Sequence, residues 1–487
     1  MSRMRTHLAF ALVATIFLSG PDLHGESLQT TIERLAGAAN LGKAQLGLVI
    51  RDLETGDEMA AIDPTALLVP ASNMKLITTA AALDLLGPDF NFSTELRLAE
   101  DGRLIVRGDG DPAFGDPVLL KTLNNMDVDA LIGTWVGAIR KLGRRKFKQL
   151  IVDDRIFDQQ WVHPRWPTDQ LHRWYCAQVA GLNFNDNCVD LYTAPLRPGQ
   201  APKLSATPSR APILLVNKAK SGSRNAVWAT RGHGGNEITV RGSVRHALTE
   251  PIPVTIHDPP LFFARTLQRH LKAAGIEVEQ VRRARPAETI PRGTLLAAVQ
   301  TSLPTVITRT NRDSQNLFAE ALLKRLGYRI THLPGSWSTG AAAVRMFLIR
   351  RLGVDAAEII MDDGSGLSPD NRVSARLLSR LLVHIHQNPR LAPTLRRSLA
   401  RPGQAGTLKR RFTDVKLVGE VYAKSGYISG VVALSGYLLH DDDRGIAFSM
   451  LLNDYHKSTY VAKKMMERIV AAADRHLAAT APARLGG

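Results

Sequence analysis

Several stretches near both ends of the chain either alternate between hydrophobic and polar residues, as half-buried β-strands do, or are continuously apolar, as fully buried strands are. The first two stretches are separated by a turn at Gly56 and Asp57, and the last three follow one another with short turns between them. The later stretches therefore predict an antiparallel meander. The predicted strands cover residues 45–50, 58–62, 418–423, 431–439 and 446–452.

Other stretches repeat their apolar residues every three to four positions, as the buried face of a helix does. One helix begins at Ser72, shortly after Pro70, and ends before Gly87 and Pro88, so both of its ends carry the expected signals. Short strands with frequent Gly, Pro and Asn lie between residues 93 and 293. The other predicted helices cover residues 131–142, 261–274, 317–326, 341–352, 374–386 and 461–476.

The changes of pattern along the chain predict its division into domains. At 487 residues the chain is long enough for two or three domains. We expect one domain built from two segments, residues 26–92 and 294–487, which carries the candidate chemistry described below. Between the segments, residues 93–293 predict an inserted α+β region of one or two subdomains.

The N-terminus, residues 1–25, has the pattern of a secretory signal peptide. Arg3 and Arg5 precede an apolar stretch at residues 8–18 that is too short to cross a bilayer. The cleavage site is poorly marked, so an uncleaved anchor is the alternative. No second stretch has a transmembrane pattern. We therefore expect an exported protein, periplasmic or otherwise extracytoplasmic, with no stable transmembrane segment in its mature form.

Composition narrows the classes of partner and cofactor. The net charge of +17 favours contact with an anionic surface, but the charges are spread along the chain without a nucleic-acid-binding module, so we expect no nucleic-acid partner. His384 and His386 are two apart on a predicted helix without further ligands, so we expect no metal and no other cofactor. Cys176 and Cys188 in an exported chain predict a disulfide, with two buried thiols as the alternative.

Ser72 and Lys75 are the first residues whose spacing points to catalysis. Three positions apart on a helix, their hydroxyl and amine are neighbours on one face. A serine becomes a nucleophile when an adjacent base removes its proton, and the N–H groups at a helix N-terminus stabilise developing negative charge. Taken alone, however, this pattern is more typical of an ordinary surface helix.

Ser314 and Asn316 lie just before the helix predicted at residues 317–326. Residues two apart do not share a helix face, but a turn before the helix would direct both side chains inward. Ser314 would then relay a proton and Asn316 would hold a substrate amide. The alternative is that Ser314 is an ordinary helix N-cap.

Lys424, Ser425 and Gly426 lie at the end of the strand predicted from residue 418. Because Gly426 has no Cβ, another backbone could approach it closely, and a substrate peptide could pair there as an extra strand. Lys424 and Ser425 would offer a cation and a hydroxyl to a terminal carboxylate. Strict alternation places these two side chains on opposite faces, so both serve one site only at a twist or a sheet edge.

The three patterns occur in an order that changes the interpretation, because S-x-x-K accompanies S-D-N and K-T-G in penicillin-binding proteins and β-lactamases. The chain resembles the D-alanyl-D-alanine carboxypeptidase and endopeptidase family, the class C low-molecular-mass penicillin-binding proteins, over nearly all of its mature length. The long insertion between Ser72 and Ser314 is typical of that family, whereas β-lactamases have a shorter interval. The chain departs from the family at Ser425, where Thr is usual, and at Gln315, where Asp or Asn is common. The matching stretches are VPASNMK (69–75), GDGDP (108–112), SQN (314–316), PGSW (334–337), DGSGLS (363–368), GTL (406–408) and KSGYISG (424–430).

The resemblance implies an α+β fold of the penicillin-binding and β-lactamase-like serine transpeptidase class, an antiparallel sheet with flanking helices. It also implies that Ser72 attacks the carbonyl between two D-alanines and forms an acyl-enzyme, with neutral Lys75 as base. Ser314 would pass the proton to the leaving amine, and the N–H groups of Ser72 and Tyr427 would form the oxyanion hole. We expect burial and the neighbouring Lys424 to lower the pKa of Lys75.

The implied partners are peptidoglycan stem peptides, with β-lactam antibiotics as covalent inhibitors. Asp363 and Ser365 lie in a Gly-rich turn that we interpret as structural, with direct ligand contact as the alternative. Two other functions stay open at this point. A β-lactamase or esterase would use the same serine chemistry with faster deacylation, and a wall-binding scaffold would keep the fold without turnover.

Overall fold

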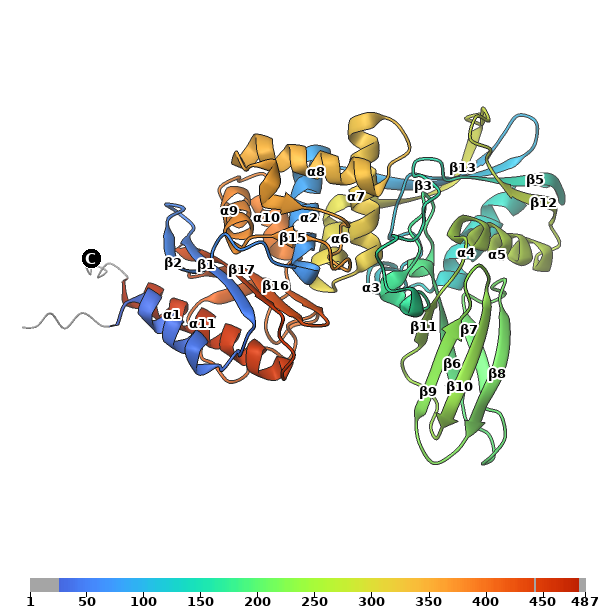
Figure 1. Cartoon of the computed structure of the whole chain (residues 1–487). Helices are drawn as coiled ribbons and strands as arrows, with labels where there is room; N and C mark the ends of the chain where they lie inside the picture. The colour runs from blue at the N-terminus through green and yellow to red at the C-terminus, as the bar shows by residue number, and fades with distance from the viewer. Residues whose placement is uncertain (1–25, 442–443, 481–487) are drawn as a thin grey trace, which may run out of the picture.

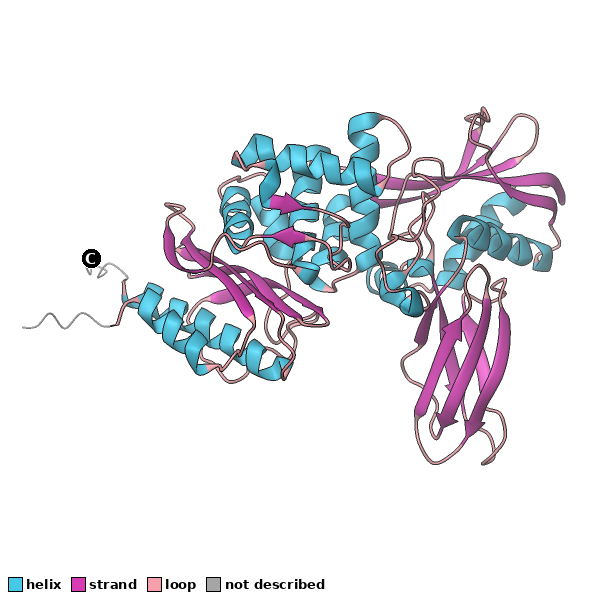
Figure 2. Cartoon of the chain, in the orientation of Figure 1, coloured by secondary structure: helices cyan, strands magenta, loops and turns pink. Residues whose placement is uncertain are grey.

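The structure is a computed structural model that describes residues 26–441 and 444–480. The predicted signal peptide at residues 1–25 lies outside these residues. Figure 1 shows two parts: a body that contains the first and last segments of the chain, and an insertion that extends away from it on one side. Figure 2 shows helices and strands in both parts. The predicted α+β fold class is confirmed.

The body is built on a five-stranded antiparallel sheet in the order β16-β17-β18-β1-β2. It joins the two ends of the chain, because β1 pairs with β18 with Leu48 opposite Met450. Strand β16 occupies one edge of this sheet. The strands are β1 (Gln45–Asp52), β2 (Glu58–Ile62), β16 (Glu420–Ile428), β17 (Val431–Leu439) and β18 (Gly445–Asn453).

Helices cover both faces of this sheet (Figure 1). On one face, α1 and α11 lie side by side and bury apolar residues against inward-facing residues of the sheet such as Leu434 and Phe448. On the other face, α2 lies at the centre of a group of helices, and its residues from Met74 to Leu83 are all buried. The helices of the body are α1 (Leu28–Ala38), α2 (Met74–Leu86), α6 (Leu303–Arg312), α7 (Asn316–Thr331), α8 (Trp337–Leu352), α9 (Ala375–His386), α10 (Ala392–Ser398) and α11 (Thr459–Ala479), and β14 (Ile359–Ile360) pairs with β15 (Arg372–Val373).

The insertion begins and ends on neighbouring strands of a second five-stranded sheet, because β3 pairs with β13 in the order β12-β5-β4-β3-β13. Helices α4 and α5 pack on one face of it around Trp135, Phe262 and Phe263. The elements are β3 (Asn91–Leu98), β4 (Leu104–Gly108), α3 (Pro117–Asn124), α4 (Val128–Arg140), β5 (Lys146–Asp153), α5 (Pro259–Ala273), β12 (Glu277–Arg283) and β13 (Thr294–Ser302).

Two three-stranded sheets form a lobe that projects from this insertion (Figure 1). One has the order β11-β6-β7 and the other β8-β10-β9. Ala219, Ala229 and Val240 of the second sheet face inward and belong to the same apolar core as α4 and α5. The strands are β6 (Cys188–Ala194), β7 (Lys203–Thr207), β8 (Leu214–Ser221), β9 (Ala226–Arg231), β10 (Glu237–Val244) and β11 (Ile252–Thr255).

Two sequence predictions differ from the structure. The predicted disulfide is wrong, since Cys176 and Cys188 are both free and buried. They lie in different packed regions, because Cys176 belongs to the core around α2 whereas Cys188 begins β6 in the lobe. The strand predicted from residue 418 also does not end at Lys424 and continues as β16 to Ile428. Within the described ranges, no helix is long and apolar enough to cross a membrane.

Candidate active site

Ser72 lies in a tight turn of 3-10 helix, Ala71–Asn73, which leads directly into α2. Ala71 has a positive φ of 46°, an uncommon conformation for a residue other than glycine, and it directs the chain into this turn. The Nζ atom of Lys75, on the first turn of α2, lies 3.1 Å from Oγ of Ser72. The spacing in the sequence therefore becomes a direct contact between hydroxyl and amine.

The Lys75 amine is completely buried and has two further partners. It donates hydrogen bonds to Oδ1 of Asn316 at 2.7 Å and to the main-chain oxygen of Ser365 at 2.8 Å. Burial lowers the pKa of Lys75 to about 7, and the carboxyl groups of Glu320 and Asp363 act in the opposite direction.

These contacts suit a neutral amine. A neutral amine has two N–H groups and one lone pair, and here Asn316 and Ser365 provide acceptors for both N–H groups. In the structure Nζ donates to Oγ of Ser72, and in the neutral amine the lone pair would take the place of that N–H and accept from the Ser72 hydroxyl. The expectation that Lys424 helps to lower the pKa of Lys75 is not met, because burial lowers it. The pKa of Lys424 is itself lowered, first by burial and then by repulsion from Lys75.

Ser314 and Asn316 both point toward this amine and hydroxyl. Ser314 lies outside α7 with a positive φ of 62°, and Asn316 is the first residue of that helix. The N-cap of α7 is Gln315, so the alternative that Ser314 is the cap is wrong. Asn316 also donates through Nδ2 to the main-chain oxygen of Tyr175 at 2.9 Å, which ties the insertion to the site.

Lys424 and Ser425 both reach the site from the edge strand β16. Nζ of the buried Lys424 donates to Oγ of Ser314 at 2.9 Å and to the main-chain oxygen of Ser425 at 2.7 Å. Ser425 is half-buried and lines the open cavity. The two side chains leave the strand on different faces, as alternation requires, and the sheet edge lets both reach one site.

Gly426 permits a close approach of backbone, although the backbone is that of the chain itself. A Cβ at this position would lie 3.0 Å from the main-chain oxygen of Pro70 and 3.1 Å from the main-chain nitrogen of Ser72. The strand is thus held against the turn that carries Ser72. Tyr427 follows on β16 with a largely exposed side chain that lines the cavity beside Ser72.

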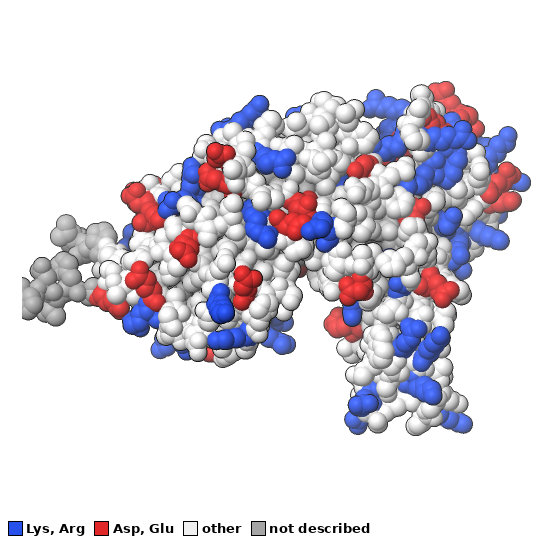
Figure 3. Space-filling model, viewed as in Figure 1, with Lys and Arg blue, Asp and Glu red and all other residues white. Residues whose placement is uncertain are grey.

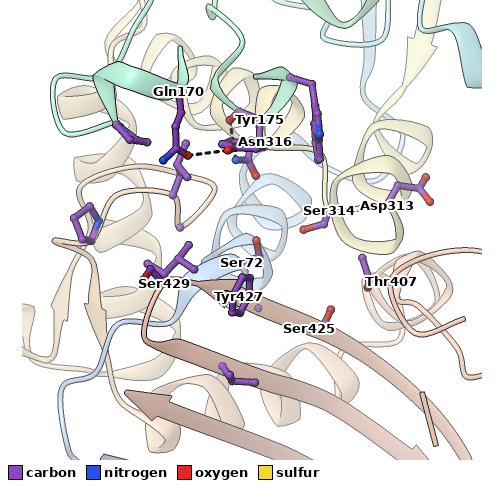
Figure 4. Close-up of a pocket in the computed structure, with 18 of the residues that line it drawn as sticks. Ser72, Gln170, Tyr175, Asp313, Ser314, Asn316, Thr407, Ser425, Tyr427 and Ser429 are labelled. Carbon is purple, nitrogen blue, oxygen red and sulfur yellow. Dashed lines mark hydrogen bonds between the residues drawn. The ribbon is translucent and has the colours of Figure 1, made fainter. Parts of the chain in front are cut away.

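The residues gather round a cavity of about 760 Å³. In Figure 4 the hydroxyls of Ser72, Ser314 and Ser425 surround one space, and Gln170 and Tyr175 of the insertion lie across from them. Six of the eight predicted site residues line this cavity, and the two lysines are buried beneath its surface. The six are Ser72, Ser314, Asn316, Ser425, Gly426 and Tyr427.

Sequence reasoning missed Glu320, which is completely buried on α7 one helical turn after Asn316. Its carboxylate accepts hydrogen bonds from the N–H groups of Ser365 at 2.7 Å and Gly364 at 2.9 Å, and from the Trp337 indole at 2.8 Å. Glu320 therefore positions the main chain whose oxygen accepts from Lys75. A carboxylate inside an apolar helix was the signal that could have revealed it.

Asp363 has the structural role that the sequence suggested. Its carboxylate accepts hydrogen bonds from the N–H groups of Gly366 at 2.8 Å and Ser368 at 2.7 Å, and from the Trp166 indole at 3.0 Å. These contacts close the Gly-rich turn and leave it buried. Ser365 serves the site through its main chain, since its carbonyl oxygen accepts from Lys75.

Glu320→Gln is expected to destabilise the protein by about 2–4 kcal/mol, because an amide N–H₂ would replace a buried oxygen that faces N–H donors. The Glu320 carboxylate raises the pKa of Lys75, so its removal should lower that pKa. The rise of kcat/KM with pH that follows deprotonation of Lys75 should then occur at lower pH. Denaturant unfolding and a pH profile of kcat/KM would measure both effects. A variant with unchanged unfolding and an unchanged profile would show that Glu320 has no positioning role.

Among the residues that the structure describes, no group of three or more His, Cys, Asp or Glu side chains could hold a metal ion. The hydroxyl and amine groups around the cavity instead form the arrangement of a serine nucleophile with an adjacent base.

Comparison with known proteins identifies the family. The model of the D-Ala-D-Ala carboxypeptidase 3 (S13) family matches residues 28–476. The chain belongs to this family. The predicted family resemblance and the predicted enzyme class, a serine-type D-Ala-D-Ala carboxypeptidase, are confirmed.

Individual relatives agree with this assignment. The chain is 31% identical to a D-alanyl-D-alanine carboxypeptidase of an Actinomadura species, over 88% of this chain and 81% of the relative. It is 24% identical to the carboxypeptidase DacB of Haemophilus influenzae, over 93% and 94%. The fold is similar to the crystal structure of penicillin binding protein 4 from H. influenzae, with a TM-score of 0.73, 23% identity and coverage of 90% of this chain and 98% of that one. A structure of the same H. influenzae protein complexed with a β-lactam matches with a TM-score of 0.69 and 22% identity.

Proposed function

We propose that this member of the family is an extracytoplasmic carboxypeptidase and endopeptidase that cleaves D-alanyl bonds of peptidoglycan stem peptides through an acyl-enzyme on Ser72. The observation that supports it most strongly is the Lys75 amine, which lies 3.1 Å from Oγ of Ser72 with acceptors for both of its N–H groups. The family match and the carboxypeptidase names of the relatives support the substrate class.

Acylation begins when Oγ of Ser72 attacks the carbonyl carbon of the penultimate D-alanine and transfers its proton to Nζ of Lys75. A C–O bond forms, and the carbonyl oxygen becomes negatively charged. The N–H groups of Ser72 and Tyr427 stabilise this charge, because Gly426 lets the strand lie against the Ser72 turn.

Collapse of this intermediate breaks the C–N bond, and the leaving amine takes a proton from Oγ of Ser314. Nζ of Lys424 donates a hydrogen bond to that oxygen at 2.9 Å, and this bond stabilises the Ser314 oxygen as the proton leaves. The Ser314 oxygen then takes up the proton that Lys75 accepted from Ser72, so both groups return to their starting states. Water attacks the ester carbonyl and transfers a proton to Lys75. Lys75 passes this proton to Oγ of Ser72 as the ester C–O bond breaks, and the shortened peptide is released with Ser72 restored.

Substrate lies along the edge strand β16, where Ser425 offers its hydroxyl to the terminal carboxylate. Lys424 is buried beneath the cavity and does not line it, but it supports the carboxylate-binding end by donating a hydrogen bond to the main-chain oxygen of Ser425. Asn316 lines the cavity, and its Nδ2 atom, which donates to Tyr175, would exchange this partner for a substrate amide.

β-Lactams act as covalent inhibitors, since a strained amide presents the same acyl group to Ser72. The β-lactam complex of the H. influenzae relative supports this. The test of the whole proposal is digestion of purified peptidoglycan with identification of the released muropeptides by mass. Loss of terminal D-alanine and breakage of cross-links is the expected result, and muropeptides identical to those of undigested peptidoglycan would contradict it.

Replacing the terminal carboxylate of a D-alanyl-D-alanine peptide with an amide is expected to lower turnover about ten- to a hundredfold, because a charge-assisted hydrogen bond contributes roughly 1.5–3 kcal/mol. Ser425→Ala should reduce the difference between acid and amide substrates, whereas the wild type should retain it. Equal kcat/KM for acid and amide in the wild type would place carboxylate recognition elsewhere.

A further inference from the structure

The lobe that projects from the insertion carries a concentrated positive charge. Residues 188–255, from the start of β6 to the end of β11, contain nine Lys and Arg and three acidic residues, Asp190, Glu237 and Glu250. None of the nine forms an ion pair with any residue in the described ranges. Figure 3 shows Lys and Arg along the lobe and a hollow between the lobe and the body. Because ion pairs do not neutralise it there, the exposed part of this charge can attract an anionic partner.

The outer face of the sheet β8-β10-β9 organises part of this charge. Its inward-facing residues, such as Ala219, Val240 and Ala229, are buried in the core, so the alternate residues of each strand face outward. In the strand register, Arg241 of β10 lies directly opposite Lys218 of β8 on one side and opposite Trp228 of β9 on the other. Two cations and an indole thus form a row about 10 Å long across the sheet.

Trp228 is held on this face by the backbone beneath it. Its side chain is 46% exposed. Gly242 has a φ of +106°, and a Cβ there would come within 2.9 Å of Cζ3 of Trp228, so the ring lies over a position that only glycine leaves open. Arg241 is held beside it by a hydrogen bond to Oγ1 of Thr230 at 3.2 Å. Contacts within the sheet therefore position two members of the row, Arg241 and Trp228.

We propose that this outer face, defined by Lys218, Arg241 and Trp228, is a second binding surface for the peptidoglycan polymer. Cations bind carboxylates, which stem peptides carry, and an exposed indole packs against flat apolar faces such as those of sugar rings. A flat sheet face suits a polymer strand, whereas small ligands require a concave site. That the polymer is peptidoglycan rests on the proposed function.

Such a surface raises the effective concentration of the polymer at the active site. Small soluble peptides would not benefit, because they reach only the cavity around Ser72. Substitutions on the outer face should therefore slow digestion of intact sacculi but not hydrolysis of a short D-alanyl-D-alanine peptide. Because the short peptide reports on the active site alone, the two substrates distinguish failure of this proposal from failure of the proposed function.

The binding test uses purified peptidoglycan sacculi with the Ser72→Ala protein, so that the polymer is not cut during sedimentation. We expect Trp228→Ala and the double variant Lys218→Ala/Arg241→Ala each to weaken binding about tenfold. The matched control is Arg140→Ala/Lys141→Ala, which removes the same charge from an exposed site at the end of α4. This control should bind sacculi within about twofold of the parent protein, because salt screens the long-range effect of two positive charges that lie away from the outer face.

The active enzyme with the same face substitutions should digest sacculi about tenfold more slowly and hydrolyse the soluble peptide at the wild-type rate. Unchanged binding in both face variants, or an equal loss in the control, overturns the proposal. A parallel sedimentation uses vesicles of phosphatidylglycerol and phosphatidylcholine in equal parts. If the face variants lose vesicle binding and keep peptidoglycan binding, the face belongs to a membrane and the proposal is wrong.

Discussion

Ser72→Ala is expected to lower hydrolysis of a D-alanyl-D-alanine peptide by roughly four to six orders of magnitude and to abolish covalent labelling by penicillin. Loss of the nucleophile removes the acyl-enzyme, so only substrate binding and oxyanion stabilisation can still accelerate the reaction. The remaining site should stay intact, because Lys75 keeps its hydrogen bonds to Asn316 and Ser365.

The measurement combines peptide turnover with mass mapping of the penicillin adduct. Ser429→Ala is the matched control, since Ser429 is another serine that lines the same cavity (Figure 4), and it should retain the adduct. Undiminished labelling of Ser72→Ala would remove the mechanism proposed for this chain. Rapid release of penicillin with many turnovers in the wild type would instead favour a β-lactamase.

The second large effect concerns Lys75, whose amine must be neutral to accept the serine proton. Burial lowers its pKa to about 7, so the neutral fraction increases as the pH rises through 7. The acylation rate should therefore rise about tenfold per pH unit below pH 7 and level off above it. If Lys75 had the ordinary pKa of a lysine, the rise in acylation rate would occur about three pH units higher.

Lys75→Arg tests this interpretation directly, because arginine keeps a positive charge and cannot act as a base near neutral pH. We expect a loss of acylation of about a thousandfold or more, with no acid limb near pH 7. Pre-steady-state penicillin acylation across the pH range would measure it, with circular dichroism to confirm folding. If the arginine variant kept the limb near 7, another group would be the base.

Many helices and strands could be predicted from the local sequence, because hydrophobic periodicity and the residues that start and stop a helix depend only on neighbouring positions. The helix after Ser72, the meander and the final helix occur where the pattern predicted them, within a few residues. The start at Ser72 was less simple, since a 3-10 turn with a positive φ at Ala71 precedes α2. The division at residues 92 and 293 stays a prediction, which the pairing of β3 with β13 supports.

By itself, the sequence determined that Ser72 and Lys75 are neighbours, because three positions on a helix fix that contact locally. Only the tertiary structure decided that Lys75 is buried with acceptors from Asn316 and Ser365, since these residues are distant in the chain and meet through packing of α2, α7 and the Gly-rich turn. It also decided that Cys176 and Cys188 stay apart, because sequence proximity does not determine which core a thiol joins. The chemistry of the base therefore depends on long-range packing, although the residue types that perform it are visible in the sequence.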